Sequence, residues 1–596
     1  MIFLSLLILI VAKALPLLNK NISSIYFTRI SAIIFIYAGV LSLNTLYIQS
    51  IGSGIGIYSG LFHITQVSQL IEFFLLIIGS FILIAWPILP KKMLNYNYST
   101  DYSLIVLFST LGSSLLISSS DLVSMYLSIE LQSFGLYVLS TLYRDSESST
   151  SAGLKYFLLG GLSSCIILLG SGIIYSYTGL TKFDSLYSLI SVSDYNYIIQ
   201  GLSLGLILII VGFLFKISAA PLHNWSPDVY DQTPTIVTIW LTVMPKIAII
   251  MLLLELHTQI EFIGGLTNIT INTNGYAELL NTLTSISTST IEPNNIINNI
   301  SVSILSPLNK IMAENSIYLL KNLLLISSLL SLIIGTVVGL IQTKIKRLLA
   351  YSTISHIGFM LLVLAINTEQ SIDSLLFYLI QYTITNLNVF LILIGLSYVI
   401  NHSLAKGGYL ENQIKLFKNN PNPIQDIKYL SQLNGIFFSQ PLLSVSLSIC
   451  LFSMAGIPPL IGFFSKQFVL YSAVQNGYYF LSVVAIIASV ISASYYLKII
   501  KNLHDDSLIN DNIMKEKELD TSNFIQYSQE EKISDKNTIN IINIEKEIKN
   551  ETSETLLSNF HSFLISSLTL SILLFILKPS LILNSTQLLS LSIFNF

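Results

Sequence analysis

Two apolar runs between Ser203 and Glu255 each carry a lysine well inside them, Lys216 in the first run and Lys246 in the second. A lysine at the centre of a membrane helix costs about 3 kcal/mol on insertion scales. Two such residues in consecutive runs therefore indicate a polar interior at the depth of the membrane.

The connection between these two runs contains three prolines, Pro221, Pro227 and Pro234. Proline lacks a backbone N–H donor and disfavours a helical conformation in the residue before it, so a continuous helix is not expected here. Non-helical backbone at membrane depth is tolerated only where protein or a water-filled cavity surrounds it. The connection therefore predicts a protected and hydrated interior.

The composition of the whole chain is typical of a helical membrane protein. Its 596 residues are 53% hydrophobic and 10% charged, with a mean hydropathy of +0.72. Ordinary soluble domains contain about 25% charged residues. We therefore expect an all-α polytopic membrane protein that contacts the lipid bilayer and binds no nucleic acid.

Apolar runs of about 20 residues predict about fourteen transmembrane helices. The predicted spans are 2–18, 31–48, 70–90, 103–119, 121–143, 153–176, 202–220, 234–255, 317–342, 348–366, 372–399, 440–474, 477–500 and 557–577. A further run at 580–596 is short. With these spans most loop lysines and arginines fall on one side, and Lys182, Lys310, Lys321 and Lys578 fall on the other. The positive-inside rule then assigns the basic side to the interior.

The chain divides into six predicted segments. They are an N-terminal three-helix segment (1–100), a first repeat (101–255), a polar outer loop (256–316), a second repeat (317–501), an acidic insert (502–556) and a C-terminal helix and tail (557–596). The acidic insert is rich in Asp, Glu, Lys and Asn and low in aromatic residues, a composition that predicts partial disorder.

Glu130, Lys216, Lys246 and Lys466 are ionisable residues inside predicted spans. Glu130 has no basic residue close to it in the sequence, so any partner must come from another helix. Attraction between opposite charges favours both ionised forms, and loss of water opposes them. A pair held between these effects can exchange protons near neutral pH. The alternative is a static ion pair that only locks two helices together.

Two of these lysines lie beside proline breaks. Lys216 precedes Pro221 in the seventh span, and Lys466 follows Pro458 and Pro459 in the overlong twelfth span. Interrupted spans at corresponding places in two halves of a transporter-like chain point to inverted repeats with a site at the midplane. The sequence therefore predicts broken seventh and twelfth helices in two inverted repeats.

His356 lies among serine and threonine residues in an otherwise apolar span. An imidazole ionises near neutral pH, which suits it to relay protons, although a hydrogen-bonded core histidine is an open alternative. The broken connection adds four polar or aromatic residues that either line an access path or cap the eighth span: His223, Trp225, Asp228 and Asp231. Glu72 and Glu255 lie near span ends, where contact with the membrane interface is expected.

Cys165 and Cys450 are the two cysteines of the chain, and both lie in apolar spans. Two thiols are too few for an iron–sulfur cluster or a zinc site, so we expect packing residues and no cofactor in this chain. The sequence also lacks the pattern of a nucleophilic triad, a metal-ligand cluster or a phosphate-binding loop. Proton or cation transfer is the chemistry that remains.

Three stretches carry a resemblance to a known family: FLFKISAAPLHNWSPDVYDQTPT, STISHIGFM and FSMAGIPPLIGFFSKQFVL. They resemble subunit 2 of mitochondrial NADH:ubiquinone oxidoreductase, respiratory complex I, an antiporter-like family, over residues 100–500. The resemblance implies fourteen helices and two inverted repeats with broken seventh and twelfth helices. The long polar loops and the Ile, Asn and Ser usage look like a fungal, mitochondrially encoded version.

The resemblance also implies roles for five residues in proton translocation. Glu130 matches the fifth-helix glutamate of the family, Lys216 the seventh-helix lysine, Lys246 the eighth-helix lysine, His356 the tenth-helix histidine and Lys466 the twelfth-helix lysine. The implied sequence loads the middle lysines from the matrix, passes protons along Lys246 and His356 toward Lys466, and releases them outward when the interaction of Glu130 with Lys216 changes.

Family membership implies that this chain holds no redox cofactor and that NADH, FMN, Fe-S clusters and ubiquinone belong to partner subunits. The partners would be other membrane-arm subunits of complex I in the mitochondrial inner membrane. Three alternatives stay open: a stand-alone or Mrp-like cation/proton antiporter, a scaffold whose buried charges only lock the helices, and an amino-acid or sugar carrier.

Overall fold

The structure of the protein is a computed structural model. It describes residues 1–14, 24–47, 54–84, 101–143, 146–192, 197–258, 320–406, 426–505 and 558–594. Most of the predicted outer loop and acidic insert lie outside these residues.

The described residues contain ten helices that are long and apolar enough to cross a membrane. They are α2 (Ser24–Thr45), α3 (Gln66–Ile84), α5 (Leu122–Ser140), α6 (Glu147–Thr178), helix 235–258 (Thr235–Thr258), helix 320–341 (Leu320–Ile341), α12 (Ile345–Ile366), α13 (Glu369–Lys406), α18 (Tyr479–His504), and α21 (Asn559–Leu573) continued by η6 (Leu574–Leu577).

The remaining helices fall outside that set. They are α1 (Ile2–Ala14), α4 (Asp101–Ile117), α7 (Phe183–Val192), α8 (Tyr197–Lys216), α9 (Trp225–Gln232), η4 (Leu430–Leu433), α15 (Ile436–Ser439), α16 (Pro441–Ala455), α17 (Ile461–Gln475) and α22 (Ser580–Phe594). The prediction of a mostly helical, multi-pass protein is confirmed, and each predicted span overlaps at least one of these helices.

Two elements lie between the predicted spans. Strands β1 (Ile55–Ile57) and β2 (Phe62–Ile64) form an antiparallel hairpin, in which Ile55 lies opposite Ile64. The hairpin is held to the end of α4, because the His63 N–H donates to the Ser118 carbonyl over 2.8 Å. Helix α7 is the second such element. A strand of three residues shows too little alternation, and a helix of ten too few turns, for the hydrophobic period to reveal either.

Three helices form the core of the bundle. In the most hydropathic stretches of helix 235–258 and α12, 94% of residues are buried, and in α13 the share is 89%. The corresponding share is 39% in α6 and 33% in the α21–η6 helix, so those helices lie at the periphery. Their exposed side chains include Leu154, Phe157 and Leu158, as a lipid-facing surface requires. A side chain buried at the middle of the core is therefore shielded from lipid on all sides.

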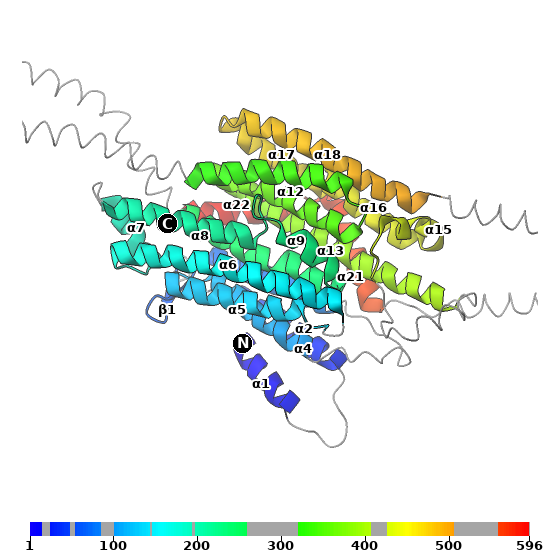
Figure 1. Ribbon diagram of the computed structural model, residues 1–596, viewed down its shortest axis with the longest axis horizontal. Helices are drawn as coiled ribbons and strands as arrows, with labels where there is room; N and C mark the ends of the chain where they lie inside the picture. The colour runs from blue at the N-terminus through cyan, green and yellow to red at the C-terminus, as the bar shows by residue number, and fades with distance from the viewer. Residues whose placement is uncertain are drawn as a thin grey trace, which may run out of the picture.

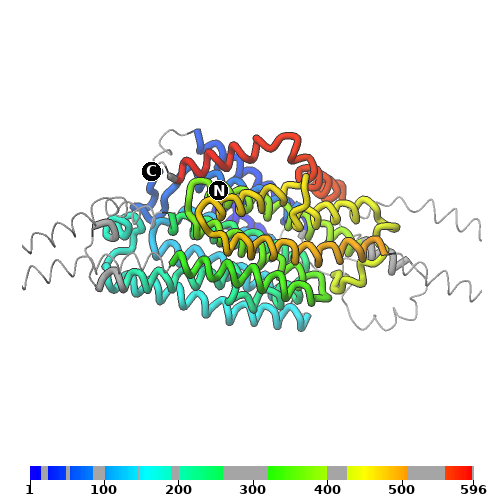
Figure 2. The backbone as a smooth tube through the Cα atoms, turned by 90° about the horizontal axis from the view of Figure 1, so that it is seen from above, coloured from blue at the N-terminus to red at the C-terminus, as the bar shows by residue number. Residues whose placement is uncertain are grey.

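The helices run side by side along the long axis of the molecule (Figure 1). Helices α21 and α22, from the end of the chain, contact both α13 and α3. Figure 2 shows these C-terminal helices next to the N-terminal ones. The end of the chain thereby joins the N-terminal segment to the core helix α13.

Both expected helix breaks are present. Helix α8 ends at Lys216, the next residues turn through Ser218 at a φ of +63°, and α9 begins at Trp225. Pro227 was expected to interrupt a helix, but it lies in the first turn of α9, where the N–H that it lacks would have no partner. Helix α16 ends at Ala455, and α17 begins at Ile461.

Candidate functional site

Glu130 and Lys216 form an ion pair between α5 and α8. The Lys216 Nζ lies 3.5 Å from the Glu130 Oε1, and the two side chains are 8% and 15% exposed. The partner of Glu130 thus comes from another helix, as its isolation in the sequence required. A buried carboxylate and a buried ammonium compensate each other's charge, so this pair can keep two ionised groups at membrane depth.

A hydroxyl competes with the carboxylate for Lys216. The Lys216 Nζ donates a hydrogen bond to the Ser164 Oγ of α6 over 2.9 Å, a shorter contact than the one to Glu130. A distance of 3.5 Å between charged groups is longer than a good hydrogen bond. The lysine is therefore anchored to α6 by hydrogen bonding and held to Glu130 by charge, and the second interaction can change while the first persists.

Lys246 is enclosed by aromatic rings in helix 235–258. It is 2% exposed, and its Nζ donates to the Tyr382 hydroxyl over 3.2 Å. The same atom lies 5.7 Å from the centre of the Tyr230 ring and 5.8 Å from that of Tyr382. Cation–π attraction partly replaces water around such a buried ammonium. No carboxylate of the described residues forms a salt bridge with Lys246.

His356 lies between two tyrosine hydroxyls. Its Nδ1 is 2.7 Å from the Tyr378 hydroxyl of α13, and its Nε2 is 3.3 Å from the Tyr496 hydroxyl of α18. The centre of the Tyr382 ring is 5.9 Å from that of the imidazole. A neutral imidazole donates from one nitrogen and accepts at the other. Both the donor and the acceptor nitrogen of His356 therefore have a hydroxyl partner.

Lys466 reaches from α17 back to the preceding half-helix. Its Nζ donates to the Ala455 carbonyl over 2.9 Å, and Ala455 is the last residue of α16. The ammonium therefore caps the negative end of the α16 dipole. The same Nζ lies 5.7 Å from the centre of the Phe359 ring, which stacks on Tyr378.

These contacts join three of the predicted residues into one buried series. It runs from Lys246 through Tyr382 to His356, and then through Tyr378 and Phe359 to Lys466. Its members come from helix 235–258, α13, α12 and α17, far apart in the sequence. Three ionisable side chains thus lie within a few contacts of one another. The contacts at the Tyr382 and Phe359 rings are not hydrogen bonds, so the described residues form no continuous hydrogen-bonded chain along this series.

Helix α9 lies between the Glu130–Lys216 pair and this series. The Trp225 Nε1 donates to the Phe215 carbonyl, beside Lys216, over 2.9 Å. The Trp225 ring meets the Tyr230 ring edge to face, 6.1 Å between centres, and Tyr230 faces Lys246. The half-helix therefore links the two lysines through aromatic packing, without a direct polar contact between them in the described residues.

Asp228 and Asp231 bind basic residues instead of capping a helix. Asp228 pairs with Lys155 and, at 3.1 Å, with Arg347, and Asp231 pairs with Lys344 at 2.7 Å and with Arg347. Of the two alternatives left open for these carboxylates, lining an access path or capping the eighth span, their described contacts do not include a cap of that span.

That cap is Asp426, whose carboxylate accepts from the Thr235 N–H and from the Thr235 hydroxyl, each over 3.0 Å. Asp426 also pairs with Lys346 at 2.6 Å. It lies almost 200 residues from Thr235 in the sequence, so no local capping pattern could have predicted it.

Sequence reasoning also missed the hydroxyl partners Ser164, Tyr378, Tyr382 and Tyr496. Serine occurs in most predicted spans and tyrosine in several, so only the fold distinguishes those that contact an ionisable group.

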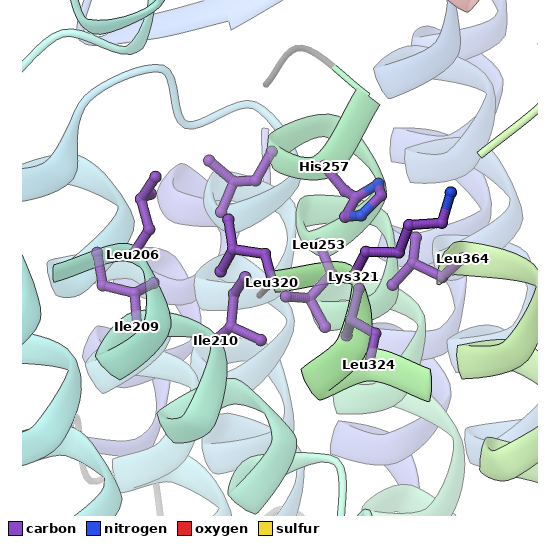
Figure 3. A pocket seen from close by; sticks show the side chains of 10 residues that line it. Leu206, Ile209, Ile210, Leu253, His257, Leu320, Lys321, Leu324 and Leu364 are labelled. Atoms are coloured by element: carbon purple, nitrogen blue, oxygen red, sulfur yellow. The ribbon is translucent and has the colours of Figure 1, made fainter. Parts of the chain in front are cut away.

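A small apolar pocket lies elsewhere, between α8, helix 235–258 and helix 320–341 (Figure 3). Leucine and isoleucine side chains line most of it, with His257 and Lys321 at one side, and none of the five predicted residues reaches it. Within the described residues no group of three histidine, cysteine or acidic side chains could hold a metal ion.

The NADH:quinone oxidoreductase/Mrp antiporter transmembrane family matches residues 119–292 and 284–492. NADH-ubiquinone oxidoreductase chain 2 of Rhizopus oryzae is 43% identical over 98% of this chain and 99% of the relative. NADH-quinone oxidoreductase subunit N of Wolbachia sp. subsp. Brugia malayi is 37% identical over 70% of this chain and 72% of the relative.

Solved structures share the fold. A chain of respiratory complex I from Thermus thermophilus with bound aureothin matches with a TM-score of 0.62 at 22% identity, covering 98% of this chain and 99% of the other. A chain of the Mrp complex from Dietzia sp. matches with a TM-score of 0.63 at 17% identity, covering 96% and 93%. The chain therefore belongs to the NADH:quinone oxidoreductase/Mrp antiporter transmembrane family, among the relatives named NADH-ubiquinone oxidoreductase chain 2.

Proposed function

We propose that this chain is the proton-translocating, antiporter-like subunit 2 of an NADH:ubiquinone oxidoreductase. The names of its relatives support this assignment. The observation that carries it is the buried set of ionisable side chains, in which Glu130 faces Lys216, and aromatic side chains connect Lys246 to His356 and His356 to Lys466. The subunit would move protons across the mitochondrial inner membrane while other subunits reduce the quinone.

The proposed architecture has fourteen transmembrane helices and two inverted repeats, at 101–255 and 317–501. Its support is the recurrence of one motif, a broken helix with a lysine beside the break, once in each proposed repeat. The N-terminal segment 1–100 and the C-terminal segment 557–596 would flank the repeats. The outer loop 256–316 and the insert 502–556 would lie on opposite sides of the membrane.

The proposed division of work gives this chain no redox chemistry. NADH, FMN, the Fe-S clusters and ubiquinone would bind to partner subunits, and the enzyme activity would belong to the whole complex. This chain would contact other membrane-arm subunits through its exposed apolar helices.

In the proposed mechanism each residue carries or controls a proton. Lys246 takes a proton from the matrix side, and His356 and Lys466 receive it in turn. A change in the interaction between Glu130 and Lys216 then drives release on the outer side, because removing a compensating charge raises the cost of keeping the next ammonium buried. The contact series gives the order of these residues, and water would complete the step from His356 to Lys466, because the Phe359 ring between them carries no exchangeable proton. The direction of transfer is taken from the family resemblance.

A second candidate is a cation/proton antiporter that works without the redox subunits. The family model that matches this chain includes Mrp antiporters, and a chain of an Mrp complex shares its fold. Transport by the purified chain in vesicles separates the two candidates. Our proposal predicts no sodium/proton or potassium/proton exchange by the isolated chain, and recovery of the chain from mitochondria in a particle that contains FMN and Fe-S clusters. Exchange at a rate typical of an antiporter, by a chain isolated without such subunits, would contradict it.

A further inference from the structure

One side chain of the described residues contacts both Lys246 and His356. This is Tyr382 of α13, which is 2% exposed and lies between helix 235–258 and α12. Its hydroxyl is 3.2 Å from the Lys246 Nζ, and the centre of its ring is 5.9 Å from that of the imidazole. Tyr382 is therefore placed where a proton would pass from the first of these groups toward the second.

The direction of its hydrogen bonds defines what Tyr382 can do. Its hydroxyl donates to the Thr242 carbonyl over 3.2 Å, so only its oxygen lone pairs face Lys246. The lysine must then donate an N–H to this oxygen, and it can do so both as an ammonium and as a neutral amine. One N–H of Lys246 remains hydrogen-bonded to the Tyr382 oxygen in both protonation states. The transferred proton leaves or joins the lysine nitrogen at one of its other positions.

We propose that Tyr382 is a positioning residue of the proton route, one that fixes the orientation of the Lys246 amine through a hydroxyl that only accepts from it. The inference rests on the proposed function, because it assumes that Lys246 carries protons. The transfer breaks an N–H bond of the Lys246 ammonium, leaving a neutral amine, and forms an N–H bond on the neutral imidazole of His356, the next group of the proposed route, which becomes an imidazolium. No covalent bond of Tyr382 is made or broken. Its hydroxyl proton remains on its oxygen and in the hydrogen bond to the Thr242 carbonyl.

Tyr230 provides a matched control in the same environment. Its ring lies at almost the same distance from the Lys246 Nζ, 5.7 Å against 5.8 Å, and it is equally buried. Among the described residues, however, the Tyr230 hydroxyl has no hydrogen-bond partner. A change of either tyrosine to phenylalanine keeps the ring and removes a buried hydroxyl, and only the change at Tyr382 removes the partner of Lys246.

The test uses the assembled complex, purified with each variant and reconstituted in lipid vesicles. The quantity measured is the number of protons moved per second and per complex during NADH:quinone turnover. We expect Tyr382→Phe to lower this flux about tenfold, since a hydrogen bond to a charged group is lost. We expect Tyr230→Phe to lower the flux much less than Tyr382→Phe does, because it keeps the ring that faces Lys246 and removes no such bond.

Lys246→Met separates failure of this inference from failure of the proposed function. If Lys246→Met abolishes the flux and Tyr382→Phe leaves it unchanged, the role of Tyr382 is refuted and the function stands. If Lys246→Met itself keeps full flux, the proton-carrying role of Lys246 fails, and the role of Tyr382 fails with it. An equal loss of proton flux in Tyr230→Phe and Tyr382→Phe would also overturn the inference. It would show that removal of any buried hydroxyl near Lys246 has this effect, whether or not the hydroxyl accepts from the lysine.

Tyr382→Gln and Tyr382→Met distinguish a positioning role from a packing role. They also provide a test if the complex with Tyr382→Phe assembles poorly. Glutamine and methionine are similar in length, and only the amide oxygen of glutamine can accept from Lys246. We expect a higher flux per assembled complex in Tyr382→Gln than in Tyr382→Met. Equal fluxes in these two variants would overturn the proposal.

Discussion

The two interrupted helices hold their lysines in different ways. At the first break Lys216 is the last residue of α8, and it faces the carboxylate of Glu130 and the hydroxyl of Ser164. At the second break Lys466 lies on the half-helix after the interruption and reaches back to the Ala455 carbonyl. One lysine is held by a side-chain charge, and the other is held by the end of a helix.

This difference separates a partner that can change from one that cannot. A carboxylate can be protonated, or can move away, and its full charge then no longer supports the ammonium. The dipole at a helix end corresponds to about half a charge and remains as long as the helix does. We therefore expect the first break to respond to events elsewhere in the complex, and the second to provide a fixed site to which protons are delivered.

The surroundings of the two breaks agree with this distinction. Helix α9, which follows the first break, forms ion pairs through Asp228 and Asp231 with basic residues of other helices. A displacement of those helices would therefore displace α9. At the second break Gly456 adopts a φ of +89°, and a Cβ there would lie 3.0 Å from the Lys466 Cδ. The backbone itself shapes the space that Lys466 occupies.

The largest effect is expected from Glu130→Gln. This change leaves Lys216 without a compensating charge, and breaking a buried pair by removing one partner costs about 3 to 5 kcal/mol. Because Glu130 is partly exposed, we take the lower end of that range and expect proton flux in reconstituted complex to fall about 100-fold. Glu147→Gln, at an exposed position of α6, serves as the control and should keep full flux. Flux within twofold of the unaltered complex in Glu130→Gln would remove the distinction between the two breaks.

An intermediate effect is expected from Gly456→Ala. An alanine in the left-handed region costs about 1 to 2 kcal/mol, and its Cβ would also push against the Lys466 side chain. We expect an about fivefold to tenfold loss of flux from displacement of the lysine.

Gly477→Ala is the matched control for this prediction. Gly477 has a similar φ of +80°, but nothing lies within 4 Å of its would-be Cβ. The two variants should lose similar thermal stability, and only Gly456→Ala should lose flux. Equal flux in both would show that the second break does not hold Lys466 through its backbone shape.

The smallest effect is expected from Ser164→Ala. It removes the hydrogen bond from Lys216 to α6 but leaves the charge of Glu130, so we expect flux to fall only about threefold. Ser163→Ala, one residue away, removes a hydroxyl that donates to the Gly160 carbonyl, as the Ser164 hydroxyl also does, but that takes no bond from Lys216, so it should have no effect on flux. A loss in Ser164→Ala as large as that in Glu130→Gln would mean that the hydroxyl, and not the charge, is the main partner of Lys216.

Much of this arrangement could be predicted from the sequence. Charged residues inside apolar runs identified Glu130, Lys216, Lys246 and Lys466, because the cost of burying a charge makes such residues rare unless they are partnered. The prolines located both breaks. These signals are local in the sequence and physically strong, so they do not depend on knowing the fold.

The partners of these residues could not be predicted in the same way. Tyr382 is 136 residues from Lys246, and Asp426 is 191 residues from Thr235. Tyrosine is half apolar and aspartate is common in loops, so neither stands out in its own segment. Helix packing brings each one to its partner, and that packing depends on the apolar faces of many helices together.

The measurement that tests this account most directly is the number of protons moved per electron by complex that carries Lys216→Met. Complex with Lys182→Met, at an exposed lysine, is the control. The account predicts that Lys216→Met assembles, still oxidises NADH with an artificial electron acceptor, and moves fewer than about a tenth of the normal protons during quinone turnover. A normal number of protons per electron at full quinone-reductase activity would contradict a direct role of this buried lysine in proton transfer.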